Sequence, residues 1–316
     1  MNPHSLSESL LQADAATVPA WDHWAGLFAA GNITQAMEAT GLGLHSLKAR
    51  TGVDEWREAS ASAHARELRQ IAHECPYSRR GFDKPRGYAG DAVLLDYIYG
   101  SAPVPEGTTD RGRAILSWMR RESTGFASVR WRRDFFASRL DALAATVSRP
   151  RVAVIAGGHF REGQRSLAVR SRAFDTLQLI DQDPASLDVV AHEQAHDGVT
   201  PVEASVRDII TGRHTLDGMD FIYSAGLYDY LAPRFATRLT AQLFDALRPG
   251  GTLIVANFVR MMEDGWMEAL MDWWLLYRTP DEVREFSSEI PHASIASQRV
   301  FMDLFENVAY LEMVKR

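Results

Sequence analysis

The second half of the chain alternates short apolar runs with helical segments, and no other feature of the sequence constrains the fold as strongly. The apolar runs have the length and composition of buried strands and lie at residues 151–156, 176–181, 199–205, 219–224 and 251–258. Helical patterns lie between them at residues 162–170, 184–195 and 232–247. Strands joined through helices of this length need crossover connections, so they pair in parallel. The sequence therefore predicts an α/β fold with a mostly parallel sheet.

The two ends of the chain differ from this pattern. Before residue 149 the apolar spacing is helical, and the longest such pattern covers residues 127–147. We expect residues 1–148 to form a helical N-terminal cap domain and residues 149–316 to form the α/β domain. At the other end, residues 299–305 and 308–314 flank a two-residue Glu-Asn turn, which predicts an antiparallel hairpin at the edge of the sheet.

The composition is that of an ordinary globular protein of 316 residues, with a net charge of −7. The one cysteine, Cys75, excludes an internal disulfide framework, and His73 beside it lacks partners at metal-ligand spacing, so we assign no metal. Arginines, Arg132 among them, gather between residues 111 and 139, but nearby acids make a solvent-exposed helix face the expected interpretation.

Charge and hydropathy also bear on location and partners. The acidic balance disfavours a nucleic-acid partner, and the sequence shows neither a signal-peptide pattern nor an apolar run long enough to span a membrane. We expect a cytoplasmic protein, monomeric or homodimeric, that acts on a small molecule and binds neither membranes nor nucleic acid.

Ligands of an open parallel sheet bind outside the carboxyl ends of the strands, so the residues that follow each strand are the first candidates for a site. Gly157 and Gly158 follow the first strand and would let the backbone approach a ligand closely, although a plain turn into a helix would also explain them. Asp181 follows the second strand at close to the spacing of about 20 residues at which an acid binds ribose hydroxyls in dinucleotide-binding folds. Asp183 precedes Pro184 and is placed to cap the next helix.

Two later segments carry further candidates. Asp208, beyond the third strand, could accept a hydrogen bond from an adenine amine, or it could form a surface ion pair. After the fourth strand, residues 224–230 combine small, aromatic and acidic side chains, which is unusual at the start of a routine helix. Ser224 and Gly226 would allow a ligand to approach, and Asp229 could take up a proton or bind a cation.

Taken in order, these motifs resemble those of class I S-adenosylmethionine-dependent methyltransferases. More narrowly, KPRGYAGD (84–91), YSAGLYDYL (223–231) and MDWWLLYRT (271–279) are similar to a bacterial group labelled 3-hydroxypalmitic acid methyl ester biosynthesis proteins. Relatives of that group include N-methyltransferases of arginine-like amino acids in natural-product pathways. The resemblance covers about residues 80 to 316 and implies a Rossmann-like sheet, S-adenosylmethionine as cofactor and a role in secondary metabolism.

The resemblance also implies roles for individual residues. The loop after the first strand would pass under the methionine part of the cofactor, Asp181 would hold the ribose hydroxyls and Asp208 would face the adenine amine. The residues implied to bind the cofactor are Gly157, Gly158, Glu162, Asp181, Asp183, Asp208, Ser224, Gly226 and Tyr88. The chain departs from the family in that Ala156 stands at the first glycine of the usual GxG, and the bulky His159 follows the second.

Methyl transfer from a sulfonium requires that the nucleophile be aligned with the methyl group and that water be excluded. A carboxylate acceptor needs no base, whereas an ammonium or guanidinium acceptor must first lose a proton. We expect Asp229 to accept that proton or to bind a cationic acceptor, with Tyr228 as a second catalytic residue.

Two further segments could line the substrate site. Residues 265–278 predict an amphipathic, aromatic-rich helix that either packs in a core or walls the substrate. The turn-rich segment 81–91 either caps the helix over 92–99 or closes the site with Tyr88 and Asp91. The residues expected to bind substrate are Asp91, Tyr230, Asp272, Trp273, Tyr277 and Arg278, the last as a partner for a carboxylate.

The sequence thus predicts a small-molecule methyltransferase that acts on an amino-acid-like nitrogen or a fatty-acid-like carboxylate. Two other classes stay open. A nicotinamide-dependent oxidoreductase would use the same sheet and ribose acid, but it would need a third glycine where Arg161 and Glu162 stand. A non-catalytic module that binds S-adenosylmethionine would explain the altered glycine loop.

Overall fold

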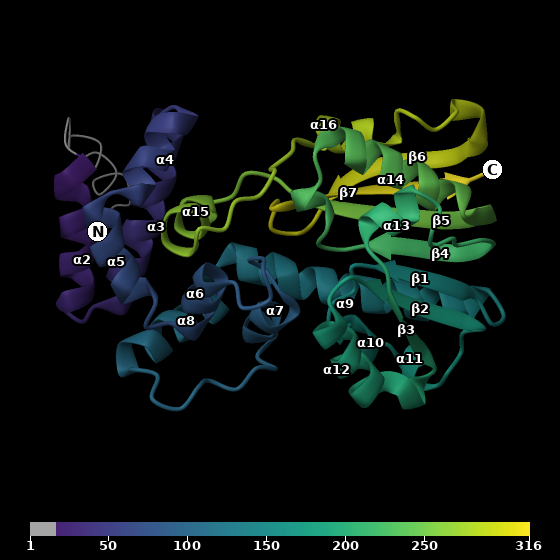
Figure 1. Ribbon diagram of the computed structural model, residues 1–316, viewed down its shortest axis with the longest axis horizontal. Helices are drawn as coiled ribbons and strands as arrows, with labels where there is room; N and C mark the ends of the chain where they lie inside the picture. Colours follow the sequence, from purple (N-terminus) through teal and green to yellow (C-terminus); the bar gives the residue numbers. More distant parts are fainter. Residues whose placement is uncertain (1–16) are drawn as a thin grey trace. The chain divides into compact units, whose positions relative to one another are not determined.

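One seven-stranded sheet, in the order β3-β2-β1-β4-β5-β7-β6, organises the computed structural model, which describes residues 17–316 (Figure 1). The strands are β1 (Arg151–Ile155), β2 (Thr176–Asp181), β3 (Val199–Glu203), β4 (Met219–Ser224), β5 (Leu247–Phe258), β6 (Ile295–Met302) and β7 (Val308–Lys315). The first five pair in parallel, and β7 lies antiparallel between β5 and the edge strand β6. The predicted parallel sheet with an antiparallel edge is confirmed.

The helices of this part of the chain follow the strands in the expected alternation. They are α9 (Thr124–Thr146), α10 (Arg161–Arg165), α11 (Leu167–Arg170), α12 (Pro184–Gln194), α13 (Val206–Ile210), α14 (Pro233–Asp245) and α16 (Pro280–Arg284). Short 3-10 turns add η1 (Ala195–Asp197), η2 (Tyr228–Tyr230), η3 (Glu285–Ser287) and η4 (His292–Ser294).

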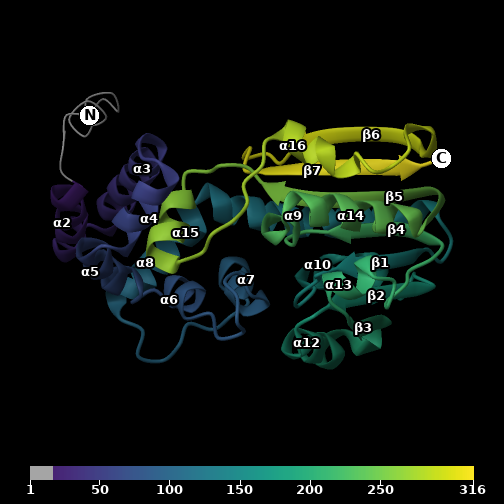
Figure 2. The same cartoon turned by 45° about the horizontal axis from the view of Figure 1, so that its top comes forward.

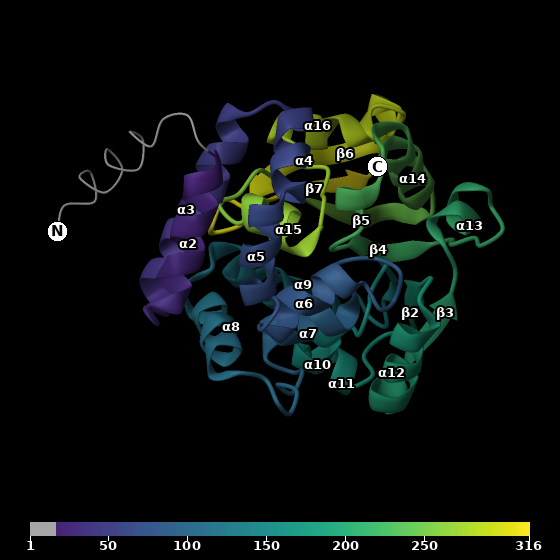
Figure 3. The same ribbon diagram turned by 60° about the vertical axis from the view of Figure 1, so that its left-hand side comes forward.

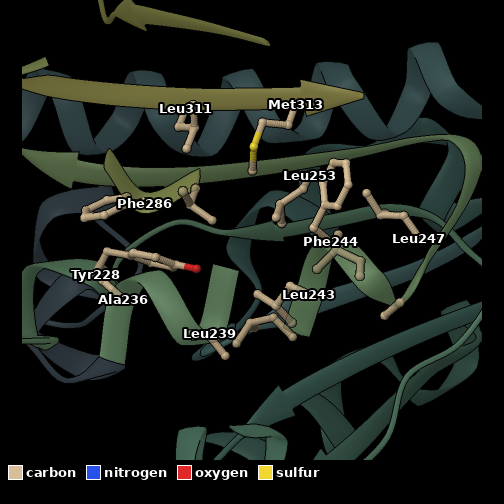
Figure 4. Close-up of a cluster of buried hydrophobic side chains, with 14 of the residues drawn as sticks. Tyr228, Ala236, Leu239, Leu243, Phe244, Leu247, Leu253, Phe286, Leu311 and Met313 are labelled. Atoms are coloured by element: carbon tan, nitrogen blue, oxygen red, sulfur yellow. The ribbon is translucent and has the colours of Figure 1, made fainter. Parts of the chain in front are cut away.

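Both faces of the sheet are covered, which is why its central strands are apolar on both sides. Every residue of β4 is buried. One face packs against α14 and η3 in a cluster that includes Leu239, Phe244 and Phe286 (Figure 4). On the other face, Phe136 of α9 stacks on Tyr223 of β4 with ring centroids 4.2 Å apart. Because both faces are buried, these strands lack the alternation of apolar and polar residues that a half-exposed strand shows.

The chain divides into two compact units, and the division falls differently from the expected boundary at residues 148 and 149. A helical unit contains the chain up to Phe126 together with Met261–Trp274, and a sheet unit contains Ala127–Arg260 and Leu275–Arg316. Most of α9 therefore belongs to the sheet unit, because its apolar residues pack on the sheet. A segment between β5 and β6 belongs instead to the helical unit.

The helical unit consists of helices of 8 to 18 residues, several of which begin with a side-chain cap. They are α2 (Thr17–Ala29), α3 (Ile33–Arg50), α4 (Val53–Ala61), α5 (Ala63–Ala72), α6 (Pro76–Asp83), α7 (Ala92–Tyr99), α8 (Asp110–Glu122) and α15 (Asp264–Met271). The helix α15 lies among α3, α4, α5 and α6 (Figure 3). All eight residues of α15 are buried, including the two acids Asp264 and Glu268, and the large apolar residues among them account for the apolar character of its sequence.

Several predicted elements match the structure to the residue, among them β2, β4 and α7. Three predictions were wrong. The helix predicted over 265–278 ends at Asp272, which adopts a left-handed conformation with φ of 47°. The helix predicted over 162–170 breaks at Ser166, whose hydroxyl caps α11. The hairpin turn is longer than two residues, because β6 ends at Met302 and β7 begins at Val308.

Candidate functional site

The candidate site lies at the carboxyl edge of the sheet, where the strand order reverses. From β1 the chain proceeds outward through β2 and β3, then returns to place β4 on the other side of β1 (Figure 2). Ligands of open α/β sheets bind at this reversal point. The loops that follow β1, β2 and β4 therefore converge on the expected position.

The loop after β1, which we call the glycine loop (residues 156–160), has an unusual backbone. Three of its five residues are left-handed: Ala156 with φ of 53°, Gly158 with 54° and Phe160 with 51°. Gly157 lies close to β2, and a Cβ atom built on it would stand 2.2 Å from Cδ1 of Leu179. A side chain at position 157 would thus force Leu179 to move, and the left-handed backbone at 158 favours glycine.

Asp181, the last residue of β2, faces the glycine loop. Its Oδ2 accepts a hydrogen bond from the N–H of Gly158 at 2.8 Å, and its Oδ1 accepts one from the N–H of Asp183 at 2.9 Å. Burial raises the pKa of Asp181, while these two N–H groups act in the opposite direction. The structure therefore places this carboxylate beside the glycine loop.

The other two acids after the strands are used within their own helices. Asp183 accepts from the N–H of Ala185 and from the hydroxyl of Ser186, and so caps α12. Asp208 forms a capping box with Ser205 at the start of α13, and the hydroxyl of Ser205 holds the pKa of Asp208 below its usual value. Its other oxygen forms an ion pair with Arg213.

Ser224 and Gly226 lie at the end of β4, beside the end of β1. The hydroxyl of Ser224 is buried and donates to the carbonyl oxygen of Ile155 at 3.0 Å. Arg132 of α9 donates to the carbonyl oxygen of Ala225, and its guanidinium lies 3.5 Å from the position of a Cβ on Gly226. The loop after β4 is thus held from one side by a buried cation.

Arg132 is a buried cation at the candidate site that the sequence did not predict. Only 4% of it is exposed, so the expectation of a solvent-exposed arginine face is wrong at this position. Its charge lowers the pKa of both Glu162 and Asp229, which burial raises. No spacing in the sequence links position 132 to residues thirty or more positions away, so only the packing of α9 on the sheet identifies it.

Glu162, at the start of α10, is buried next to the aromatic face of the sheet. The hydroxyl of Tyr223 donates to its Oε1 at 2.9 Å. Burial raises the pKa of Glu162, and the Tyr223 hydroxyl and the Arg132 charge partly offset that effect. A carboxylate therefore stands where a dinucleotide fold would present a helix N-terminus to a pyrophosphate.

Asp229, in η2, is 2% exposed and joins three segments. Its Oδ1 accepts from the N–H of Phe258 at 2.6 Å, and its carbonyl oxygen accepts from the N–H of Leu276 at 2.8 Å. Burial raises the pKa of Asp229 to about 6, although Arg132 and Arg278 favour the charged form. A carboxyl group with this pKa can exchange a proton near neutral pH.

Tyr228 and Arg278 have structural partners. The Tyr228 side chain is fully buried in the core, and its hydroxyl hydrogen-bonds with that of Thr240 at 3.0 Å (Figure 4). Arg278 donates to the carbonyl oxygen of Tyr228 at 2.8 Å and to Oδ1 of Asn257 at 2.6 Å. These partners hold both polar groups within the sheet unit. Tyr230 is 40% exposed and Tyr277 is half-buried, both in the sheet unit.

Four predicted site residues belong to the helical unit. Asp91 caps α7 by accepting from the N–H of Leu94, and it forms an ion pair with Arg80 at 2.7 Å. Asp272 is exposed and accepts from the ammonium group of Lys84. The remaining two are Tyr88, which is half-buried, and Trp273, which is buried.

Within residues 17–316, no helix is long and apolar enough to cross a bilayer. In the same part of the chain, no three His, Cys, Asp or Glu side chains are placed to hold a metal ion.

Comparison with solved structures identifies the fold. A "possible exported protein" from Bordetella parapertussis matches with a TM-score of 0.54 at 19% identity, over 71% of this chain and 79% of its own. A "putative methyltransferase" from Thermobifida fusca matches with a TM-score of 0.50 at 16% identity, over 71% of this chain and 94% of its own. The chain has the class I methyltransferase fold.

A third structure, a DUF574 family protein from Streptomyces avermitilis, shares this class I methyltransferase fold with a TM-score of 0.51 at 18% identity, over 71% of this chain and 97% of its own. No protein-family model matches the sequence, and a comparison with curated proteins finds no match either. The class I methyltransferase fold is therefore established by structure, and the chemistry has to be argued from the site.

Proposed function

We propose that the protein is an S-adenosylmethionine-dependent methyltransferase of a small molecule. The observation that carries this proposal is the pairing of Asp181 with the glycine loop at the reversal point of a class I methyltransferase fold. A buried carboxylate at the end of β2 can accept hydrogen bonds from both hydroxyl groups of a ribose. The adjacent loop allows close approach of a ligand. S-adenosylmethionine supplies, when bound, a sulfonium methyl group that is transferred by in-line displacement.

The residues present fit such a cofactor in part. Asp181, Gly157 and Gly158 would hold the ribose and the methionine part, and the loop at Ser224 and Gly226 would line the same pocket. We leave out Asp183 and Asp208 as direct ligands, because their carboxylates cap α12 and α13.

The pKa of Asp229 favours a methyl acceptor that must lose a proton before it reacts. Its pKa of about 6 leaves it mostly ionised at pH 7 and able to take up a proton. An amino-acid-like amine needs such a base, whereas a fatty-acid-like carboxylate does not. We therefore propose N-methylation, with Asp229 as the proton acceptor and Tyr230 and Tyr277 of the sheet unit as candidates for contact with the substrate.

The alternative of a nicotinamide-dependent oxidoreductase is disfavoured by Glu162. A buried carboxylate at the start of α10 would repel a pyrophosphate placed on that helix N-terminus.

A methyl-transfer assay with basic amino acids and with long-chain fatty acids tests the proposal, using wild type and Asp229→Asn. We expect turnover with an amine acceptor, and at least about a hundredfold lower kcat in Asp229→Asn with unchanged cofactor affinity. Asparagine keeps an oxygen for the N–H of Phe258, so the local fold should persist. Methylation of fatty acids alone, or full activity of the variant, would contradict the assignment of Asp229.

A further inference from the structure

The C-terminal end of α12 holds the glycine loop through a single buried amide. Gln194 is 1% exposed, and its Nε2 donates to the carbonyl oxygen of His159 at 3.0 Å and to that of Phe160 at 3.2 Å. These two carbonyl groups belong to the last residues of the loop. Gln194 therefore fixes the direction of the backbone where the loop enters α10.

The loop needs such support because its conformation is unfavourable by itself. Phe160 is left-handed, and it begins α10 without a side-chain cap. A left-handed conformation at a non-glycine residue persists only where the surroundings impose it. At Gly163, a Cβ would stand 2.2 Å from the Phe160 ring and 2.7 Å from Oε1 of Gln194. The side chains of Phe160 and Gln194 therefore pack directly against the backbone of Gly163.

The adjacent residue on α12 strengthens the same attachment. Glu193 accepts from Arg161 at 2.5 Å and from Gln164 at 2.8 Å, both in α10. Gln194 thus binds the glycine loop, and its neighbour Glu193 binds α10.

The choice of glutamine at position 194 carries a cost as well as a benefit. Among the described residues, Oε1 of Gln194 is buried and has no hydrogen-bond partner. An apolar side chain of similar volume would avoid that cost, but it would leave the carbonyl groups of His159 and Phe160 without this donor. The benefit of the glutamine lies in the two carbonyl groups that it orients.

We propose that Gln194 is a positioning residue for the cofactor, acting through the glycine loop that it holds in its left-handed form. This inference rests on the proposed function in so far as the ligand is S-adenosylmethionine. Asp181 binds the same loop at Gly158, so Asp181 holds its middle and Gln194 holds its C-terminal end.

The test compares Gln194→Leu with wild type and with the matched variant Gln298→Leu. Gln298 on β6 also donates through Nε2, to Ser287, and it lies outside the site. We expect Gln194→Leu to bind S-adenosylmethionine about tenfold or more weakly by calorimetry, with a ligand-free Tm only slightly below that of wild type, because one buried donor is lost. An affinity within about twofold of Gln298→Leu, or a loss matched by a general loss of Tm, would overturn the proposal.

The variant Gln194→Glu tests the hydrogen-bonding role through the pH dependence of the affinity, which a role in packing alone would not change. An ionised carboxylate cannot donate to the two carbonyl groups, whereas the protonated form can donate to one of them. The affinity ratio of wild type to Gln194→Glu should therefore shrink as pH falls, and a pH-independent ratio would contradict the hydrogen-bonding role.

Hydrogen exchange of the ligand-free protein separates this inference from the proposed function. We expect faster exchange over residues 156–164 in Gln194→Leu and unchanged exchange there in Gln298→Leu. Equal protection in the two variants would overturn the inference even if S-adenosylmethionine binds. If wild type does not bind S-adenosylmethionine, the proposed function fails, and the exchange result still decides whether Gln194 holds the loop.

Discussion

Ala156 holds a left-handed backbone with φ of 53°, at the position where the resembled family has glycine. Such a conformation costs an alanine about 1–2 kcal/mol, and the greater flexibility of unfolded glycine offsets about 0.5–1 kcal/mol of that. We therefore expect Ala156→Gly to increase the free energy of unfolding by about 0.5–1 kcal/mol in urea titrations. The control Ala153→Gly, within β1, should lower it; equal losses in both variants would contradict strain at Ala156.

The Asp229 side chain affects both the free energy of unfolding and the proposed proton transfer. Because its pKa is raised from 3.8 to about 6, folding favours the protonated form, so its contribution to stability falls as pH rises from about 4 to 6. Asp229→Asn removes this effect, and we expect the variant to gain up to about 2–3 kcal/mol over wild type at pH 7. Urea titrations should show that gain disappearing below about pH 4. A gain that is independent of pH would exclude a raised pKa.

At the scale of elements, the sequence predicted the regular strands well and the connections poorly. Strands such as β2 and β4 are continuous apolar runs, and burial on both faces leaves no ambiguity of period. The end of α15 depends on a left-handed Asp272, which no propensity indicates. In the site, Asp181 and the glycines were predicted from their places after strands. Arg132 and Gln194 reach the site only through helix packing, and no local pattern could identify them.

The turn between β6 and β7 is organised by one carboxylate. Asp303 accepts from the N–H groups of Asn307 at 2.8 Å and of Val308 at 3.1 Å, which explains a turn longer than the predicted Glu-Asn pair. Asp303→Ala leaves both N–H groups without this partner and should lower the free energy of unfolding by about 1–3 kcal/mol. Asp303→Asn keeps one acceptor oxygen, so its loss should be smaller; equal losses would show that the hydrogen bonds are not the cause.

At the scale of the whole molecule, the chain leaves the sheet unit after β5, contributes α15 to the helical unit and returns for β6. A buried charge network holds α15 there. The ammonium group of Lys48 on α3 lies 2.8 Å from carboxylate oxygens of both Asp264 and Glu268, and the indole of Trp56 donates to Glu268 at 2.7 Å. Lys48 thus joins both acids of α15 to α3, and Nδ1 of His45 lies 3.1 Å from Oδ1 of Asp264.

Lys48→Met would remove the ammonium group that lies between two buried carboxylates. We expect a loss of about 3–5 kcal/mol in the free energy of unfolding at pH 7. Burial already raises the pKa of Glu268, and losing Lys48 would raise it further, so the loss should shrink as pH falls and the carboxylates become protonated. Lys48→Arg, which keeps the charge, should lose less. A loss that is equal at pH 7 and pH 4 would contradict the charge network.

Calorimetric titration of the full chain with S-adenosylmethionine, S-adenosylhomocysteine and NAD, in wild type and Asp181→Ala, tests the central claim most directly. The account predicts micromolar binding of the two adenosyl sulfur compounds, no binding of NAD, and an affinity about tenfold or more weaker in Asp181→Ala without loss of fold. Binding of NAD alone, or of none of the three after removal of any co-purified ligand, would contradict it.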